Sequence, residues 1–526
     1  MQRCRAVPAA AVGTFFLIAV VPLAVMFFRS FYADGQLTAS AWHQVLGSAA
    51  QWRLLGRSVV LASFVTLATL AAGIPLGVLL GRTDLPGRRF FLFVMLLPLL
   101  VPPAVWAVGW SDFLAPDGGA ARLFGAAAAR QAAAWFYGLP GAVLVHASVF
   151  LPVPVLVTMV LLRSVPPRME EAGRLVAGWG AVLRFVSLPL AAPGIVTAAL
   201  LVFLLSLGEY TVPGMLRYPV YAAEIMTQFA AFYDFAAATA MSAPLAGVAL
   251  LLLLAEAGMR RRRESMPPAG AVRPLTVRLG DWKRAVTAAS VLFFAATAGI
   301  PLVSLLWRAG GVRTYAETFG RTAGTLADSL LYAAAAASLM TLLGFFIGYL
   351  IRHGSRYCRR TADTATLFLF ALPGSVVGIG LSALWNTPWT GFVYATPLII
   401  VLGYTAAYTA LPSRIVAAQL ALIPDSAEEA ARLAGASWGQ RMIRIVAPMA
   451  RRGIAAAWLA AALFSLRDTS VTMIVYPPGR ETLPVALLTS MANGAPEQIA
   501  ALCVIILGVT FLLLMLLLPL WRGEAA

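Results

Sequence analysis

The sequence predicts an all-α polytopic membrane protein in which twelve transmembrane helices form two parallel six-helix repeats. Of the 526 residues, 60% are hydrophobic and only 12% are charged, about half the charge of an ordinary soluble domain. Apolar runs of about 20 residues recur, which is the length that a helix needs to cross a bilayer. Motifs of the first half also recur in the same order in the second half.

The apolar runs define the expected spans. A helix satisfies its own backbone hydrogen bonds in lipid, whereas a transmembrane barrel would show alternating segments of about ten residues. The eleventh run is short, so we expect it to include residues from its flanks. The expected spans are residues 11–31, 58–81, 90–111, 141–162, 192–210, 236–257, 285–307, 327–351, 365–385, 391–413, 453–466 and 499–521.

The internal repeat is visible in matching residues. Trp179 and Trp438 lie 259 residues apart, and each follows an acidic, alanine-rich segment. Six spans separate the copies, and an even number of crossings places both halves in the membrane the same way up. Other matches are Ser58, Gly73 and Gly77 with Ser329, Gly344 and Gly348, Pro98 and Trp110 with Pro373 and Trp385, and Glu209 with Asp468. The Gly-x-x-x-Gly spacing permits close helix approach, and the paired prolines are expected to bend their helices.

The repeat and the charges give a domain organisation and a topology. We expect a first half at residues 1–257, a basic Pro/Gly linker at 258–284 and a second half at 285–526. With both termini inside, 28 of the 39 basic residues fall on the inner side, whereas the 22 acidic residues divide evenly. Because the positive-inside rule explains the net charge of +17, that charge does not indicate a nucleic-acid partner.

The sequence lacks the residues of several kinds of active site. Lys283 is the only lysine, so the chain has no Walker A motif, which needs a lysine to reach the nucleotide phosphates. If ATP drives this protein, another subunit binds it, and we expect no cofactor in this chain. The three cysteines and three histidines are scattered, so we expect no metal site, no catalytic residues and no enzymatic activity.

One acidic residue per half lies near the outer end of a span. Ion-coupled carriers usually place ionisable residues deep in their helices, but here the middles of the spans are nearly all apolar. The two acids are either interfacial helix caps or part of the outer mouth of a translocation path. The candidate path residues are Ser206, Glu209 and Tyr210 in the first half and Ser465, Arg467 and Asp468 in the second.

Each half also carries a charged loop on the predicted inner side. Proline followed by acidic residues starts a helix, because acids are favourable at the positive end of the helix dipole. A glycine then ends or bends this helix, which we expect to lie along the membrane surface. An amphipathic helix that only anchors the bundle is the alternative. The candidate loop residues are Glu170, Glu171, Ala172 and Gly178 in the first half and Glu428, Glu429, Ala430 and Gly435 in the second.

The second loop resembles a known family motif. Glu429-Ala430-Ala431-x-x-x-Gly435 with a downstream proline is similar to the EAA loop of permeases of type I ABC importers, and Glu171-Ala172-Gly173 is similar to a diverged copy. The resemblance implies the permease fold of that family, in the plasma (inner) membrane of a bacterium. It also implies that each loop forms a coupling helix that docks on a cytoplasmic ATPase. Ala177 stands where the family has its glycine, with Gly178 one residue later.

Two halves on one chain narrow the resemblance to fused permeases, similar to those of ferric-iron and thiamine importers, with polyamine and aminoethylphosphonate systems related. The resemblance implies two copies of an ABC ATPase, a periplasmic or surface solute-binding protein and a lipid bilayer as partners. Ferric iron is the expected cargo. An ion-coupled secondary carrier with two parallel halves is the alternative class, because it has the same number of spans.

Overall fold

The structure is a computed structural model that describes residues 3–33, 36–261 and 275–516. Among these residues, eight helices are long and apolar enough to cross a membrane, and up to twelve spans result if each of four bent helix pairs is one span. The prediction of an all-α polytopic membrane protein is therefore confirmed. Within the predicted linker, α16 continues to Arg261. Residues 262–274, which include Arg262 and Arg263 of the run Arg260-Arg261-Arg262-Arg263, lie outside the described residues.

The chain divides into two compact units that cut across the halves of the repeat. The first-half unit is Ala49–Glu224 with Gly247–Gly311, and the second-half unit is Met1–Ser48, Ile225–Ala246 and Val312–Ala526. Each unit therefore combines most spans of one half with the first span of the other half. The boundaries at 257 and 285 stay a prediction about the repeat.

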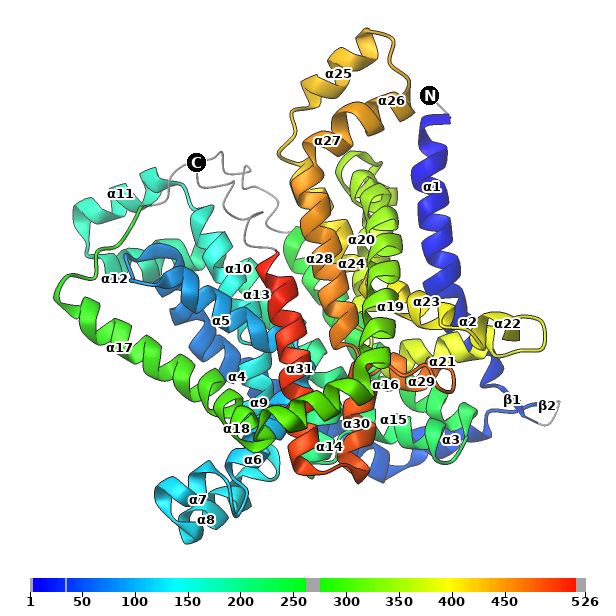
Figure 1. The fold of residues 1–526 in the computed structure, drawn as a ribbon. Coiled ribbons are helices and arrows are strands. Elements are labelled where there is room, and N and C mark those ends of the chain that lie inside the picture. Colours follow the sequence, from blue (N-terminus) through cyan, green and yellow to red (C-terminus); the bar gives the residue numbers. More distant parts are fainter. Residues whose placement is uncertain (1–2, 34–35, 262–274, 517–526) are drawn as a thin grey trace. The chain divides into compact units, whose positions relative to one another are not determined.

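The first-half unit consists of helices (Figure 1). They are α4 (Ala49–Arg82), α5 (Arg88–Leu100), α6 (Pro103–Phe113), α7 (Gly119–Phe124), α8 (Ala126–Phe136), α9 (Leu139–Phe150), α10 (Pro152–Arg163), α11 (Pro167–Val176), α12 (Trp179–Val182), the π-helical turn η2 (Leu183–Ser187), α13 (Leu188–Gly208), α14 (Thr211–Met215), η3 (Gly280–Trp282), α17 (Lys283–Phe294), η4 (Ala295–Gly299) and α18 (Ile300–Ala309). Helices α15 (Tyr221–Ala230) and α16 (Phe235–Arg261) run from one unit into the other.

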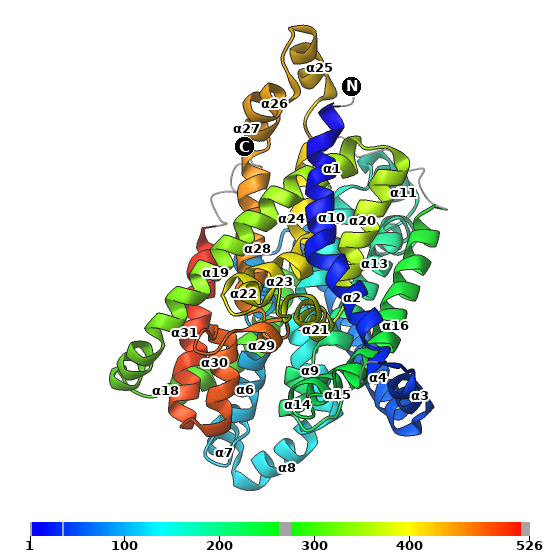
Figure 2. The ribbon, with the colours of Figure 1, turned by 90° about the vertical axis from the view of Figure 1, so that its right-hand side faces the viewer.

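The second-half unit has the same kind of architecture, with one short hairpin in its described part (Figures 1 and 2). Its elements are α1 (Arg3–Phe15), η1 (Phe16–Val20), α2 (Val21–Arg29), β1 (Tyr32–Ala33), β2 (Gln36–Leu37), α3 (Ser40–Gly47), α19 (Val312–His353), α20 (Arg356–Ala371), α21 (Gly374–Trp385), α22 (Gly391–Tyr394), α23 (Leu398–Tyr408), α24 (Ala410–Leu420), α25 (Asp425–Leu433), α26 (Trp438–Arg441), η5 (Met442–Val446), α27 (Ala447–Met449), α28 (Arg451–Arg467), α29 (Thr472–Val475), α30 (Leu483–Asn493) and α31 (Pro496–Met515).

The repeated glycines lie where two helices touch. A Cβ atom at Gly77 of α4 would lie 2.9 Å from the carbonyl oxygen of Val155 on α10, and one at Gly348 of α19 would lie 2.7 Å from that of Ser413 on α24. No side chain fits at such distances. The glycine spacing therefore builds the same helix pair inside each unit.

The first span of each half also packs in the same way. A Cβ atom at Gly109 of α6 would lie 2.7 Å from Pro301 of α18, and one at Gly380 of α21 would lie 2.9 Å from Leu23 of α2. Gly109 and Gly380 are 271 residues apart, the spacing of the other repeated glycines. In each unit, the first span of the other half thus meets a repeated glycine.

The third and ninth spans are broken rather than gently bent. Helices α5 and α6 meet at 101°, and α20 and α21 meet at 105°. The predicted pairing of Pro98 with Pro373 is wrong, because Pro98 lies inside α5 whereas Pro373 caps α21. The matching residue is Pro102, which caps α6 and stands 271 residues before Pro373. Each capping proline lacks a backbone N–H, which suits the start of a helix.

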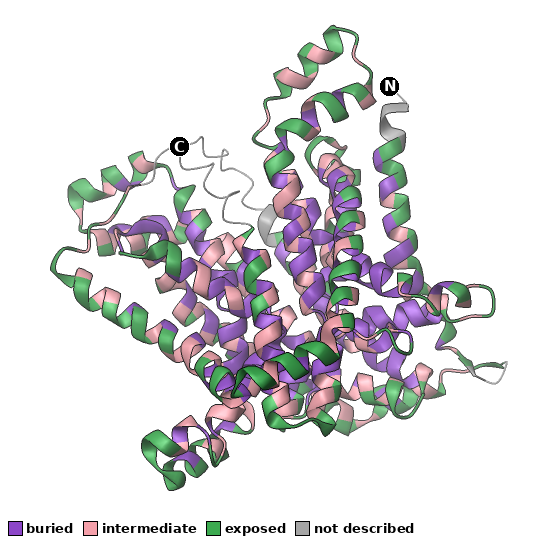
Figure 3. Ribbon diagram, in the orientation of Figure 1, coloured by how far each residue is buried: buried purple, intermediate pink, exposed green. Residues whose placement is uncertain are grey.

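The short eleventh span does include residues from its flank, because Trp438–Met449 and Arg451–Arg467 together form a pair bent by 76°. Buried and exposed residues alternate along the spans of each unit (Figure 3), and exposed apolar side chains such as Phe64 and Leu67 of α4 lie within them. The short helices that follow α10 and α24 are among the most exposed parts of the described chain (Figure 3).

Candidate functional site: two charged loops and two acidic caps

The first charged loop forms helix α11 as the sequence predicts. Pro166 caps the helix, Pro167 is its first residue and Glu170 lies in its first turn, where a negative charge is favourable. Glu170 is 1% exposed, and its Oε1 accepts hydrogen bonds from Arg82 Nη2 at 2.7 Å and from Ser187 Oγ at 2.7 Å. Glu170 therefore points into the unit and attaches α11 to the end of α4.

The opposite face of α11 carries exposed apolar residues. Glu171 and Ala172 are exposed, and Leu175 and Val176 are 88% and 87% exposed. A charged helix that presents nearly bare leucine and valine side chains differs from an ordinary surface helix, whose apolar stripe faces the core. Such a face suits contact with another protein.

The second loop forms helix α25 in the same orientation. Glu428 is the inward residue, and its Oε1 accepts a hydrogen bond from Tyr349 Oη at 2.9 Å. Arg441 Nε lies 3.6 Å from the same oxygen. Glu429 and Ala430 are exposed, and Leu433 is 84% exposed. The first glutamate of each loop thus faces its own unit, and the second faces outward.

The two loops end differently. Gly435 has a φ of +84°, which favours glycine, and Ser437 and Gln440 then form a capping box at the start of α26. In the first loop, the shorter turn leaves Ala177 extended, and Gly178 caps α12 with a φ of −72°. A backbone of this kind does not require glycine, so Gly178 does not replace Gly435 in its turn.

The two acidic candidates of the path lie at equivalent places, each at the end of a long helix. Glu209 follows α13, and its two oxygens accept hydrogen bonds from the backbone N–H groups of Thr211 at 2.9 Å and Val212 at 3.0 Å. Asp468 follows α28, and its Oδ2 accepts from the N–H groups of Val471 at 3.2 Å and Thr472 at 3.0 Å. Both acids therefore cap the short helix that follows, and both are largely buried.

The other candidates surround these caps. Ser206 is buried, and Tyr210 directly follows Glu209. Ser465 is buried and its hydroxyl donates to the Ala461 carbonyl. The Arg467 guanidinium lies 5.3 Å from the centre of the Phe464 ring. The structure assigns the caps a structural part, and a place on a translocation path stays a prediction.

Sequence reasoning missed His146, which it treated as an isolated histidine. His146 is fully buried, and its Nε2 lies 2.8 Å from Glu209 Oε2. The residue 258 positions later is Tyr404, whose hydroxyl lies 2.9 Å from Thr472 Oγ1 beside Asp468. The repeat held this signal, because both positions place a polar ring beside an acidic cap.

No group of three or more His, Cys, Asp or Glu side chains converges within the described ranges in a way that could hold a metal ion. The two charged loops can present the short helices α11 and α25 to a partner, and the two acids cap α14 and α29. The paired glutamates bind their own chain on one side and leave an exposed surface on the other. Such helices suit the transmission of a movement through protein–protein contact.

Comparison with known proteins gives consistent matches. A family model described as "Binding-protein-dependent transport system inner membrane component" matches residues 340–522. The ferric transport system permease protein FbpB of Actinobacillus pleuropneumoniae is 24% identical over 493 residues, which are 88% of this chain and 70% of the relative. The putative ferric transport system permease protein FbpB 1 of Haemophilus influenzae is 23% identical over 495 residues, covering 88% and 76%. The molybdenum transport system permease protein ModB of Escherichia coli (strain K12) is 32% identical over 166 residues, covering 30% and 69%.

Proposed function

Since this chain belongs to the family of inner-membrane components of binding-protein-dependent transport systems, we propose that it is the fused permease of an ABC importer whose cargo is ferric iron. Members of this family are the membrane permeases of transport systems, and this chain is such a permease. We also propose its cargo, its partner subunits and its orientation in the membrane.

The observation that carries the coupling part is the exposed face of α11 and α25. Leu175, Val176 and Leu433 lie almost fully in solvent on helices whose other face is attached to the unit. We infer that each face docks on one copy of a cytoplasmic ABC ATPase. The ATPase then binds the ATP, because this chain has no Walker A motif and its single lysine, Lys283, is not part of one. Closure of an ATPase dimer then moves both helices together.

The proposed orientation places α11, α25 and both termini in the cytoplasm. In the second-half unit, α25 and the start of α1 lie at the same end (Figure 1). That end is basic in the sequence, as the positive-inside rule expects for the cytoplasmic side. A soluble binding protein then delivers cargo at the opposite end, near the helices that Glu209 and Asp468 cap.

Ferric iron is favoured because two relatives that match 88% of this chain are named ferric transport permeases. Relatives named for molybdenum and putrescine transport match 30% and 39% of it. Thiamine, a polyamine and aminoethylphosphonate are the alternative cargoes within the same machinery.

Co-purification tests the coupling part. We expect an ABC ATPase to be recovered with the chain from native membranes in mild detergent, and the pair Leu175→Glu and Leu433→Glu to abolish that recovery. Leu37→Glu is the matched control, because Leu37 is also strongly exposed, at 74%, but lies on β2. The proposed docking is refuted if the ATPase stays bound to the double variant Leu175→Glu with Leu433→Glu and the double variant Glu171→Ala with Glu429→Ala transports fully.

Uptake into vesicles tests the cargo and the energy source. The chain, its ATPase and its binding protein are reconstituted, and accumulation of radioactive ferric iron is compared with that of molybdate, putrescine and thiamine. We expect iron accumulation that depends on ATP and survives a protonophore. Accumulation that collapses with the proton gradient while ATP remains would instead support the secondary carrier, and transport of another solute alone would replace iron as the cargo.

A further inference from the structure

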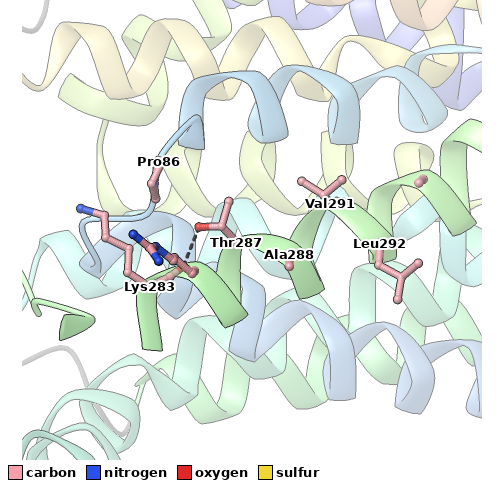
Figure 4. Close-up of a pocket in the computed structure, with 8 residues that line it drawn as sticks. Pro86, Lys283, Thr287, Ala288, Val291 and Leu292 are labelled. Carbon is pink, nitrogen blue, oxygen red and sulfur yellow. Dashed lines mark hydrogen bonds between the residues drawn. The ribbon is translucent and has the colours of Figure 1, made fainter. Parts of the chain in front are cut away.

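An apolar groove of about 640 Å³ runs along the outer face of α17, the seventh expected span. Its volume falls within the range of about 300–1,000 Å³ that small-molecule sites occupy. Lys283 lies at one end of the row of lining residues and Leu292 at the other, with Pro86 opposite the helix (Figure 4). The inner face of α17 is buried, since Phe294 stacks on Phe91 of α5 at 5.2 Å.

The groove walls are exposed and belong to a candidate membrane span. Val291 and Leu292 are 53% and 72% exposed and lie within the span Gly280–Ala309. From Lys283 to Ala295 the helix rises about 18 Å at 1.5 Å per residue. One leaflet contributes about 15 Å of the hydrocarbon core. The groove therefore has the length of one lipid acyl chain.

Lys283 and Arg284 line the polar end of this groove, and the chain segments on either side of it are basic. The segments 84–89 and 278–284 hold five basic and two acidic residues. One acid, Asp84, accepts a hydrogen bond from Lys283 Nζ at 2.9 Å. The Leu279 backbone N–H and the Lys283 ammonium hold the pKa of Asp84 below its ordinary value, so Asp84 remains ionised and partly neutralises Lys283.

The remaining cations have no such neutralisation. Arg88, Arg89, Arg278 and Arg284 are exposed, and within the described ranges none of them forms an ion pair with an acidic side chain. The other acid, Asp281, is exposed on η3. The exposed aromatic residues Phe90 and Trp282 flank the arginines, at 65% and 74% exposure, as expected at the level of the lipid headgroups.

We propose that this groove binds one anionic phospholipid, with an acyl chain along Ala288, Val291 and Leu292 and the headgroup phosphate between Arg284 and Arg88. A basic pocket beside membrane helices is a recognised arrangement for anionic headgroups. The guanidinium groups match phosphate oxygens in geometry as well as in charge. The site does not depend on which solute the chain carries.

Native mass spectrometry of the purified chain tests this site without any transport activity. The full chain in mild detergent is titrated with phosphatidylglycerol or with phosphatidylcholine of the same acyl chains, and retained lipids are counted. We expect one phosphatidylglycerol to be retained preferentially. The double variant Arg88→Gln with Arg284→Gln should weaken its binding at least fivefold, since each cation near the surface contributes roughly that factor.

Two further variants separate a site from bulk charge. Arg356→Gln with Arg359→Gln removes the same charge at the start of α20, where Arg359 holds the repeat position of Arg88, and should leave the binding unchanged. Ala288→Trp fills the groove at an exposed position and should reduce retention of both lipids. Equal weakening by both arginine pairs, equal retention of the two lipids by the unmodified chain, or no effect of Ala288→Trp overturns the proposal.

Discussion

Arg82 and Glu170 form a buried ion pair that joins the end of α4 to the helix of the first loop, with 2.7 Å between Nη2 and Oε1 and both side chains at most 2% exposed. Arg82 also donates to the backbone carbonyls of Leu162 and Leu275. One guanidinium therefore holds α11, the end of α10 and the segment that precedes α17.

The second loop is attached in another way. At the repeat position of Arg82 stands His353, and Glu428 is held instead by Tyr349 and Arg441 while its side chain stays 21% exposed. A buried charge that loses its partner costs far more than a partly hydrated one. Helices α11 and α25 are therefore attached to their units with unequal strength.

The first prediction concerns this inequality. Glu170→Gln leaves the Arg82 guanidinium buried without its counter-charge, and we expect a loss of about 3–5 kcal/mol in stability. Glu428→Gln keeps an oxygen for the Tyr349 hydroxyl, and we expect a loss of about 1 kcal/mol. Thermal unfolding of the two purified variants in the same detergent compares them. Equal shifts of the two unfolding midpoints contradict the inequality.

The second prediction concerns the glycine contacts. Gly77→Ala places a Cβ atom 2.7 Å from that of Thr158, and overpacking of this kind costs about 1–3 kcal/mol. Gly56→Ala on the same helix meets nothing within 4 Å, and its greater helix propensity should stabilise the chain by about 0.5–1 kcal/mol. The unfolding midpoints should therefore move in opposite directions, and a common direction would show that α4 and α10 are further apart.

The third prediction concerns the ends of the two loops. Gly435 has a φ of +84°, so Gly435→Ala forces a side chain into the left-handed region at a cost of about 1 kcal/mol. Gly178 has an ordinary φ, and a Cβ atom there would meet nothing within 4 Å, so Gly178→Ala should be neutral. Hydrogen exchange of α25 and α11 measures the effect, and faster exchange of α11 in Gly178→Ala would contradict this account.

The sequence was enough to predict the elements that have a distinctive composition, namely the membrane spans and the two charged helices. Apolar runs located the spans, and the acidic, alanine-rich segments located α11 and α25. It also paired Glu209 with Asp468 correctly as equivalent positions, because the residues around them match.

The sequence did not predict which side chains meet, because hydrophobic periodicity reports burial and not the partner. Arg82 lies 88 residues from Glu170, and His146 lies 63 residues from Glu209. An arginine at the end of an apolar helix, such as Arg82, is what the positive-inside rule expects at many span ends. The repeat did not single it out, because the equivalent position in the second half is His353. The wrong pairing of Pro98 arose similarly, since two prolines lie four residues apart and composition alone does not select Pro102.

The last prediction distinguishes the two acidic caps. At Glu209, both oxygens accept from backbone N–H groups, Oε1 from Thr211 and Oε2 from Val212. In Glu209→Gln, either orientation of the amide sets its NH2 group against one of these donors, which costs about 1–3 kcal/mol.

At Asp468, by contrast, a single oxygen, Oδ2, accepts from the backbone N–H groups of Val471 and Thr472 and from the Thr472 hydroxyl, while Oδ1 accepts from the Tyr408 hydroxyl at 2.6 Å. An asparagine keeps that oxygen for the backbone, and its NH2 group donates to the Tyr408 oxygen, since a hydroxyl both donates and accepts. Asp468→Asn should therefore unfold close to the unmodified chain, and Glu209→Gln well below it. If Asp468→Asn keeps its unfolding midpoint but loses uptake in vesicles, the carboxylate serves transport through its charge, and if uptake is also retained, Asp468 is only a helix cap.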